Sequence, residues 1–184
     1  MFHRQTIVAI GELMQLAYVT SDLDKAFAEW AAIGVGPFYT VERAPFTEVR
    51  YRGEVIDLDL SVGFAYWGNM QIEVIRQNDR SQSIFRDWQD RGISTLHHVC
   101  VAVSDMADVR RRLTENNHEI LQEKWAGAAG EFVYAKPLTG PDLLVEYALI
   151  GPPFDTAFEA MRAAAATWDG SRPVRPISEV APFG

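Results

Sequence analysis

The stretch at residues 96–106 reads Leu-His-His-Val-Cys-Val-Ala-Val-Ser-Asp-Met, a run of β-branched and apolar residues that ends at Ser104-Asp105-Met106. This composition is typical of a buried strand, and serine followed by aspartate is a helix-start signal. Residues 13–23 repeat the arrangement as Leu-Met-Gln-Leu-Ala-Tyr-Val-Thr-Ser-Asp-Leu. Aligning the two aspartates places Gln15 on His98, because 15 to 22 and 98 to 105 are the same separation. Two matching strands therefore each begin with a polar side chain.

The length and composition indicate a globular chain. With 184 residues, 48% of them hydrophobic, the chain can bury a core as one domain or as two closely packed small ones. A net charge of −8 argues against nucleic acid or an anionic membrane as a partner. Cys100 is the one cysteine in the sequence, which excludes an internal disulfide and fits a reducing compartment. Since no apolar run is long enough to span a bilayer and residues 1–5 lack a signal-peptide pattern, we expect a cytoplasmic protein.

Both copies continue in the same way after the opening strand. An amphipathic helix follows at 22–33 in the first copy and at 105–116 in the second. Further strands are predicted at 38–42, 46–52, 55–66 and 70–75, and again at 119–125, 131–135 and 143–149. We expect two βαβββ modules over 12–77 and 95–150, a linker at 78–94 with a short helix, and a C-terminal helix and extended tail over 152–184. The predicted fold class is α+β, with one domain over 1–151 built on a curved, partly closed mixed sheet that has its helices outside.

Each module closes with a strand that contains an isolated carboxylate, Glu73 in Met-Gln-Ile-Glu-Val-Ile and Glu146 in Leu-Leu-Val-Glu-Tyr-Ala. A carboxylate inside an apolar strand is costly unless it is paired or bound to a metal. If the opening and closing strands pair around a curved sheet, Gln15, Glu73, His98 and Glu146 can converge on one point. Alternation along a strand places small residues beside Gln15 and His98, which leaves a cavity, and it turns His97 to the opposite face from His98.

At these residues the sequence resembles the vicinal oxygen chelate superfamily, which includes glyoxalase I, methylmalonyl-CoA epimerase, extradiol dioxygenases and bleomycin-resistance proteins. The resemblance covers residues 13–150, and its motifs are Gln-Leu-Ala-Tyr-Val-Thr-Ser-Asp-Leu, Gly-Val-Gly-Pro-Phe-Tyr at 34–39, Gln-Ile-Glu-Val-Ile, Leu-His-His-Val and Val-Glu-Tyr. In that family one side chain from each opening and closing strand binds a divalent metal. Carried over by position, the resemblance implies Gln15, Glu73, His98 and Glu146 as the metal ligands.

This ligand set narrows the chemistry that the resemblance implies. An imidazole, an amide and two carboxylates suit one divalent ion of Zn, Co, Ni, Mn or Mg and leave positions open for the oxygens of a substrate. An iron-dependent extradiol dioxygenase would need a second histidine where Gln15 stands, so oxygen activation is disfavoured. The set resembles that of some glyoxalase I enzymes more than that of the epimerase. However, the basic residues by which glyoxalase I anchors glutathione have no counterpart that we can place here.

The resemblance implies an enzyme, a metal-dependent isomerase, epimerase or lyase that abstracts a proton next to a carbonyl through a metal-stabilised enolate. We expect Glu146 to be the base and Glu73 the complementary acid or base. Aromatic residues at the strand ends favour a small carbonyl substrate that is hydrophobic or aromatic, with a coenzyme A thioester left open, and we expect a homodimer. Two alternatives remain, a metal-free binding protein of the drug-sequestering kind and the less favoured dioxygenase. In the former, the two buried carboxylates would have no cation.

Overall fold

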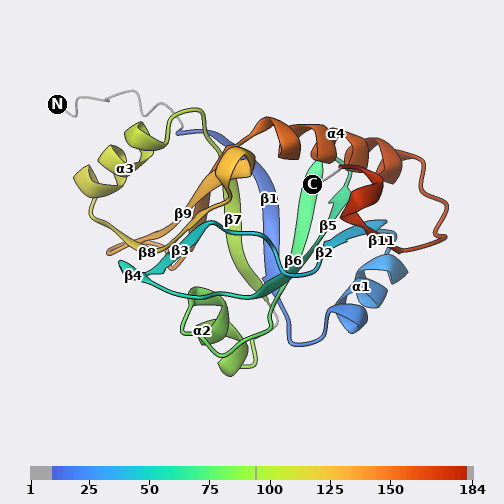
Figure 1. Ribbon diagram of the computed structural model, residues 1–184, viewed down its shortest axis with the longest axis horizontal. Coiled ribbons are helices and arrows are strands. Elements are labelled where there is room, and N and C mark those ends of the chain that lie inside the picture. Colours follow the sequence, from blue (N-terminus) through green and yellow to red (C-terminus); the bar gives the residue numbers. More distant parts are fainter. Residues whose placement is uncertain (1–9, 94, 182–184) are drawn as a thin grey trace.

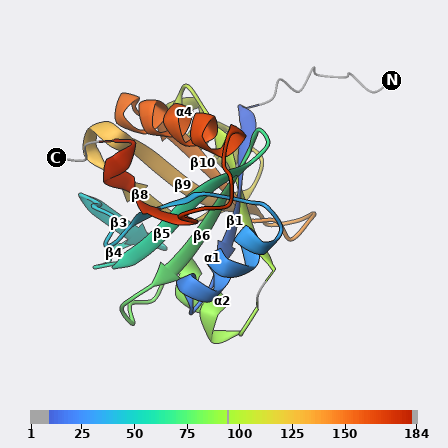
Figure 2. The same ribbon diagram turned by 90° about the vertical axis from the view of Figure 1, so that its right-hand side faces the viewer.

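The computed structural model describes residues 10–93 and 95–181, and within them it contains one mixed, eleven-stranded sheet and four α-helices. Helices α1 (Leu23–Ala32) and α3 (Met106–Glu115) lie toward opposite ends of the molecule. Helix α4 (Pro152–Ala166) lies across the top of the views, and α2 (Ile84–Asp90) lies at the opposite side (Figure 1, Figure 2). The sheet is not closed, because its two edge strands do not pair with each other. The predicted α+β class is confirmed.

Two modules follow each other with the same order of elements. The first contains β1 (Glu12–Val19), α1, β2 (Phe38–Val41), β5 (Leu60–Trp67) and β6 (Met70–Gln77), and the second contains β7 (Leu96–Ala102), α3, β8 (His118–Trp125), β9 (Gly130–Pro137) and β10 (Val145–Ile150). Both helices begin where the repeat predicts. The Asp22 carboxylate accepts a hydrogen bond from the Lys25 N–H and that of Asp105 from the Asp108 N–H, each at 3.0 Å. These aspartates are N-caps, which satisfy donors that a helix end leaves free.

The order of the strands brings the predicted ligands together. Across the sheet it is β11 (Val174–Pro176), β2, β5, β6, β1, β7, β10, β9, β8, β3 (Glu48–Tyr51) and β4 (Glu54–Val55). The opening strands β1 and β7 pair antiparallel at the centre, and each pairs in parallel with its own closing strand, β6 or β10. The four strands that carry the predicted ligands are therefore neighbours, in the order β6-β1-β7-β10.

The β3–β4 hairpin leaves its own module. The sequence predicts a strand at 46–52 within the first module, but β3 pairs antiparallel with β8 of the second, with Glu48 opposite Trp125 and Tyr51 opposite Gln122. Strand β2 pairs directly with β5 instead. Local alternation predicts that a strand exists, whereas its partner depends on contacts distant in the sequence. The crossing therefore joins the two modules by a second set of backbone hydrogen bonds, in addition to those between β1 and β7.

Three β-bulges interrupt the regular pairing, two between the central strands β1 and β7 and one between β8 and β9 toward one edge of the sheet. The extra residues are Met14 in β1, His97 in β7 and Leu121 in β8. A bulge places two successive residues opposite one partner residue, so it breaks the strict alternation of side chains. Each bulge is followed directly by a buried polar residue, namely Gln15, His98 and Gln122. The bulges thus decide which way these polar side chains point.

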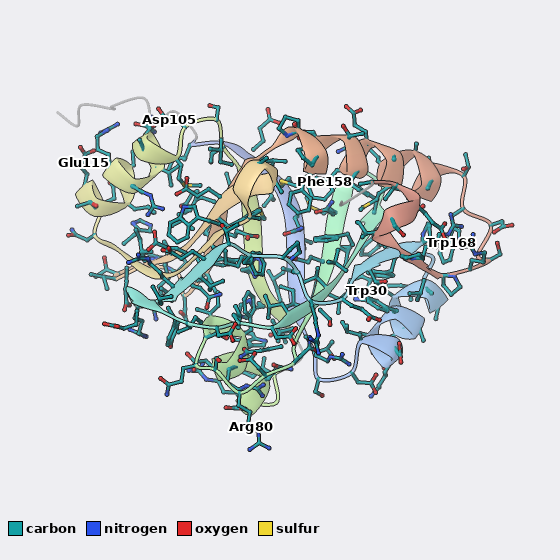
Figure 3. The ribbon with its side chains drawn as sticks, in the orientation of Figure 1. Trp30, Arg80, Asp105, Glu115, Phe158 and Trp168 are labelled. Carbon is teal, nitrogen blue, oxygen red and sulfur yellow. The ribbon has the colours of Figure 1, made fainter. Side chains whose placement is uncertain are left out.

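The C-terminal segment covers one side of the sheet. Helix α4 begins at Pro152, at the start of the segment expected to hold the C-terminal helix, and a proline fits there because the first N–H groups of a helix have no helical partner. The tail that the sequence predicts as extended includes β11, which pairs in parallel with β2, and a short 3-10 turn, η2 (Ile177–Glu179). Figure 3 labels Phe158 on the α4 side that faces the sheet, where its ring lies 5.8 Å from that of Phe64.

Several expectations concern the whole protein. Among the helices of the described residues, none is long and apolar enough to cross a membrane. The division of the chain into a domain over 1–151 and a C-terminal segment stays a prediction, as do the cytoplasmic location and the homodimer.

Candidate metal centre and cavity

Three of the predicted ligands lie together in the interior. One ligand atom from each of Glu73, His98 and Glu146 falls within 4.8 Å of the others, and all three residues are buried. His98 Nε2 lies 3.2 Å from Glu146 Oε2 and 3.7 Å from Glu73 Oε2. The pairing of the strands explains this, because Ala17 on β1 stands opposite both Glu73 and His98, and Cys100 on β7 stands opposite Glu146. An alanine between two longer side chains leaves them room to meet.

Gln15 is held by a chain of amides beside this cluster. Its Nε2 donates to Gln71 Oε1 at 2.5 Å, and Gln71 Nε2 donates to the Tyr66 hydroxyl at 3.2 Å. The other end of the amide, Gln15 Oε1, is buried and has no hydrogen-bond partner among the described residues. Gln15 also lines the same cavity as Glu73 and Glu146. The amide is therefore fixed with its acceptor oxygen free, as a metal ligand requires.

His97 orients the ring of His98. The bulge at His97 makes the expectation that the two rings face apart wrong, and their Nδ1 atoms lie 2.8 Å from each other. Nε2 of His97 lies 3.2 Å from the Ile84 carbonyl, which can only accept a hydrogen bond. Burial, followed by the neighbouring His98, lowers the pKa of His97 to about 3, so this ring is neutral.

The hydrogen-bond partners of His97 and His98 determine which nitrogen of each ring carries a proton. With its proton on Nε2, His97 must accept at Nδ1, and His98 must donate from its own Nδ1. This leaves Nε2 of His98 directed at Glu73 and Glu146, where a proton or a metal ion can be held. Metal-binding histidines are commonly oriented by such a hydrogen bond to the second ring nitrogen. The sequence analysis missed this role of His97, since a bulge leaves no pattern in a single sequence.

The surroundings of Glu73 and Glu146 shift the pKa values of the two carboxyl groups in opposite directions. Burial, followed by the charge of Glu146, raises the pKa of Glu73 to about 8. Burial also acts to raise the pKa of Glu146, but the Lys124 ammonium, His98 and the Tyr134 hydroxyl outweigh it and lower the pKa to about 2. Tyr134 donates a hydrogen bond to Oε1 of Glu146, and Lys124 Nζ lies 3.6 Å from the same oxygen. Glu146 is thus a firmly held anion, whereas Glu73 binds a proton near neutral pH.

The donor set fits a divalent metal ion. Gln15 Oε1 and Glu73 Oε2 are buried acceptors without a hydrogen-bond partner within the described part of the chain. Unpaired buried acceptors cost free energy, and a cation between them would remove that cost. Two carboxylates, one imidazole and one amide oxygen are ligands that Zn, Mn or Mg accept. Gln15, Glu73, His98 and Glu146 are the residues that would hold the ion.

The sequence also matches a family model. The description of that family is "Glyoxalase/Bleomycin resistance protein/Dioxygenase superfamily", and the match spans residues 14–134. This chain belongs to the glyoxalase/bleomycin resistance/dioxygenase superfamily. No curated protein matches the sequence significantly. Membership in the superfamily agrees with the vicinal oxygen chelate fold that the two modules form, and with the resemblance found in the sequence.

Solved structures of the superfamily fold are similar to this chain at low identity. The methylmalonyl-CoA epimerase from Mycobacterium tuberculosis is 16% identical with a TM-score of 0.55, and the alignment covers 83% of this chain and 99% of that one. A Streptomyces coelicolor methylmalonyl-CoA epimerase in complex with 2-nitronate-propionyl-CoA is 13% identical with a TM-score of 0.57, covering 78% and 97%. A hypothetical protein from Bacillus halodurans C-125 is 12% identical with a TM-score of 0.55, covering 77% and 95%. At these identities the likeness shows the fold alone.

The cavity beside the candidate metal ligands is lined in part by a segment outside the family match. Its volume is about 540 Å³, within the range of small-molecule sites. Glu73 and Glu146 line it together with Gln15, and its walls are largely apolar. Phe154 and Phe158 of α4 line it as well, and their rings are stacked at 5.5 Å. The match ends at 134, so helix α4, which lines part of this cavity, lies outside the matched residues.

Proposed function

We propose that this protein is a divalent-metal-dependent isomerase, epimerase or lyase that removes a proton from a carbon next to a carbonyl. The observation that carries the proposal is the buried group of Glu73, His98 and Glu146, with the free oxygen of Gln15 beside it, on the wall of an apolar cavity. A divalent ion in this site would act as a Lewis acid on the carbonyl oxygen of a bound substrate. Zn, Co, Ni, Mn and Mg all remain candidates for that ion.

Glu73 is the residue whose surroundings best suit the movement of a proton. Its Oε2 has no hydrogen-bond partner among the described residues, and in the metal-free chain its pKa is raised to about 8, close to neutral pH. A base works best when its pKa is near the working pH. Glu146 is held by Tyr134, Lys124 and His98, and its pKa of about 2 makes it a weak base. The family resemblance implies Glu146 as the base, whereas the electrostatics favour Glu73 for that role, with Glu146 as a fixed ligand.

A metal-free binding protein is the second candidate. Without a metal ion, the Lys124 ammonium and the Tyr134 hydroxyl already balance Glu146, and Glu73 is neutral when protonated. Such a site holds no unbalanced charge without a metal ion, although Gln15 Oε1 and Glu73 Oε2 then have no hydrogen-bond partner among the described residues. The apolar cavity could then hold a small molecule without reacting with it.

The test separates metal binding from proton transfer. Protein stripped by a chelator is titrated with Zn²⁺, Co²⁺ and Mn²⁺ by calorimetry, and a panel of small aryl and alkyl carbonyl compounds is incubated with it in D₂O and followed by NMR. We expect metal uptake, and metal-dependent deuterium exchange at the carbon next to a carbonyl. Glu73→Gln keeps a neutral oxygen ligand and should slow the exchange by about a hundredfold or more, the usual contribution of a general base.

Matched variants show which residue is responsible for metal binding and which for proton transfer. Glu146→Gln should weaken metal binding more than Glu73→Gln does, because Glu146 supplies the firmly ionised ligand. Glu29→Gln, an exposed residue on α1, is the control and should change neither measurement. Absence of metal uptake by the wild-type chain would overturn the enzymatic proposal in favour of the binding protein. Metal uptake with undiminished exchange in Glu73→Gln would remove Glu73 from the role of base.

A further inference from the structure

Lys124 lies in an unusual position for a lysine. It comes from β8, it is 5% exposed, and its ammonium is surrounded by four aromatic rings. The distances from Nζ to the ring centroids are 4.8 Å for Tyr134, 5.0 Å for Phe46, 5.1 Å for Phe132 and 5.6 Å for Phe85. Aromatic faces attract a cation. These four rings therefore hold the side chain in one place instead of letting it extend to solvent.

The bulge at Leu121 turns Lys124 toward the cavity. Ile120 packs on the α3 side of the sheet and Glu123 pairs with Arg110 of α3, so both point away from the cavity. Leu121 packs into the main core and Lys124 lines the cavity. In a regular strand Ile120 and Lys124 would share one face. The extra residue changes that alternation and places the ammonium inside.

The Lys124 ammonium has unused hydrogen-bond donors. Lys124 Nζ makes no hydrogen bond to the described residues. Its ion-pair partner Glu146 Oε1, at 3.6 Å, is beyond hydrogen-bond distance and already accepts a hydrogen bond from Tyr134. A lysine ammonium carries three donors. Buried donors without acceptors are costly, and the aromatic rings offer none. The free side of the ammonium borders the cavity, so an oxygen atom of a ligand in the cavity would satisfy it.

The charges of the site point to a single negative charge on that ligand. When Glu73 and Glu146 hold a divalent cation, their two charges are balanced, and the Lys124 ammonium is left without a counter-ion. Among the described residues that line the cavity, Lys124 is the one with a basic side chain, and the remaining walls are mainly apolar. A ligand with several phosphates would find no further cation on these walls. A monoanion with an apolar body satisfies both the charge and the walls.

We infer that Lys124 binds the carboxylate of a small aryl or alkyl acid, so that the substrate of the proposed enzyme is an apolar carbonyl acid with one negative charge. This inference rests on the proposed function for the reacting carbonyl, whereas the binding of the carboxylate does not depend on any reaction. Lys124 acts as a specificity-determining residue, which recognises the charge of the substrate while the apolar walls recognise its body.

Unreactive probes test the inference by binding alone. Calorimetry measures the affinities of 3-phenylpropionate, 4-phenylbutyrate and hexanoate and of their uncharged amides for the zinc-loaded protein. We expect at least one carboxylate to bind more tightly than its amide. In Lys124→Met, which keeps the length of the side chain, this preference should fall by about tenfold or more, as expected for a hydrogen bond between charged groups. Lys124→Arg should retain part of it, and Lys136→Met, a lysine of β9 outside the cavity walls, should retain all of it.

The outcomes separate this inference from the proposed function. The zinc affinity of each variant is measured first, so that a loss of carboxylate binding is not confused with a loss of metal. If wild-type protein takes up no metal, the proposed function fails, and the same comparison is made on metal-free protein. There, Glu146 balances the Lys124 ammonium, so the comparison uses Glu146→Gln, and a preference for carboxylates that disappears when Lys124→Met is added supports the inference. Equal affinities for acid and amide in the wild type, an unchanged preference in Lys124→Met, or tighter binding of propionyl-CoA that Lys124→Met leaves unaltered would each overturn it.

Discussion

Glu73 and Glu146 are the same residue type on equivalent strands of two modules, yet they differ in what surrounds them. Lys124 and Tyr134 come from strands of the second module and both approach Glu146. Glu73 has no equivalent pair of donors, and the charge of Glu146 adds to the effect of burial on its pKa. The module repeat therefore places two carboxylates symmetrically, and side chains outside the repeated motif make one of them an anion and the other a proton carrier.

The stability of metal-free protein should depend on pH through Glu73. Its pKa is about 8 in the folded chain against an ordinary value of 4.5, so the folded state binds the proton more tightly than the unfolded state does. The resulting stabilisation is complete below pH 4.5 and is lost as the pH rises through about 8. Below pH 6.5 this fall is opposed by His97, whose pKa is about 3 in the folded chain against an ordinary value of 6.5. Between pH 6.5 and 8 the free energy of unfolding, measured by urea denaturation, should therefore fall by more than about 1 kcal/mol, the equivalent of less than one pKa unit.

Two controls test that assignment. Glu73→Gln has no proton to lose, so its free energy of unfolding should stay flat where that of the wild type falls. Exposed Glu29→Gln should behave as the wild type. Glu146 has a pKa of about 2 in the folded chain and an ordinary value of 4.5, so above pH 6.5 it is ionised in both the folded and the unfolded state and adds no slope. A slope that persists in Glu73→Gln would assign the effect to another group.

The candidate site could be predicted from the sequence only in part. The repeat of Ser21-Asp22 in Ser104-Asp105 sufficed to align Gln15 with His98 and to find the closing strands with their two carboxylates. Lys124 was missed because it stands between Glu123 and Trp125, and an isolated lysine in such a stretch is typical of a solvent-exposed position. Its burial depends on a bulge and on rings from three other parts of the chain, none of which leaves a periodic pattern.

At the scale of elements, the bulge in β7 and helix α2 together orient the His97 ring, which a regular strand would turn away from His98. The linker between the modules was expected to carry a short helix, and α2 confirms this. Its first residue, Ile84, accepts a hydrogen bond from His97 through its carbonyl and donates one to Gln122 through its N–H at 3.2 Å. The bulge at His97 turns the ring back toward His98. A connecting segment thereby supports the ring that is expected to bind metal.

His97→Phe should weaken metal binding without unfolding the protein. Phenylalanine keeps the ring contacts with Phe85 and Trp88 but removes the hydrogen bond that fixes the His98 ring. Loss of such a supporting partner typically lowers metal affinity by about 10- to 100-fold. Zinc affinity by competition with a chromophoric chelator measures the effect, and circular dichroism checks the fold.

Two further variants test whether His97 acts through its hydrogen bond to His98 or through the size of its side chain. His97→Asn offers an acceptor oxygen to His98 and should recover part of the affinity, although it is smaller than phenylalanine. His118→Phe, at a histidine on the first residue of β8 whose ring bonds only locally to Asn116, should leave zinc affinity unchanged. If His97→Phe binds zinc as tightly as the wild type, the ring of His98 needs no support from its neighbour.

At the scale of the whole molecule, α4 forms one wall of the cavity. Phe158 stacks on Phe154 and contacts Phe64 of β5, so the helix is attached to the sheet through aromatic packing. The sequence predicts the helix and its stripe of apolar residues, but the pattern of one helix cannot show which surface it covers. The structure shows that α4 covers the cavity beside the candidate metal ligands.

Phe158→Ala should both destabilise the protein and open the cavity. Removal of a buried phenylalanine ring costs about 3 kcal/mol, and slightly less is expected here because the ring is 9% exposed. Urea denaturation measures this loss, and the affinity for 3-phenylpropionamide should fall in parallel. Glu159→Ala, on the exposed side of α4, is the matched control and should alter neither quantity. Unchanged amide affinity in Phe158→Ala would show that α4 does not contact ligands.

The hairpin that crosses from the first module to β8 has a consequence for how such a gene can change. Phe46, just before β3, brings one of the four rings around Lys124, so the second module's lysine relies on residues inherited with the first. Swapping one half for its counterpart from a sister gene would disturb both the edge pairing and the charge recognition at once. The two modules are therefore expected to evolve together. New ligand preferences should arise by substitutions around the cavity and in α4, and not by exchange of a whole module between related genes.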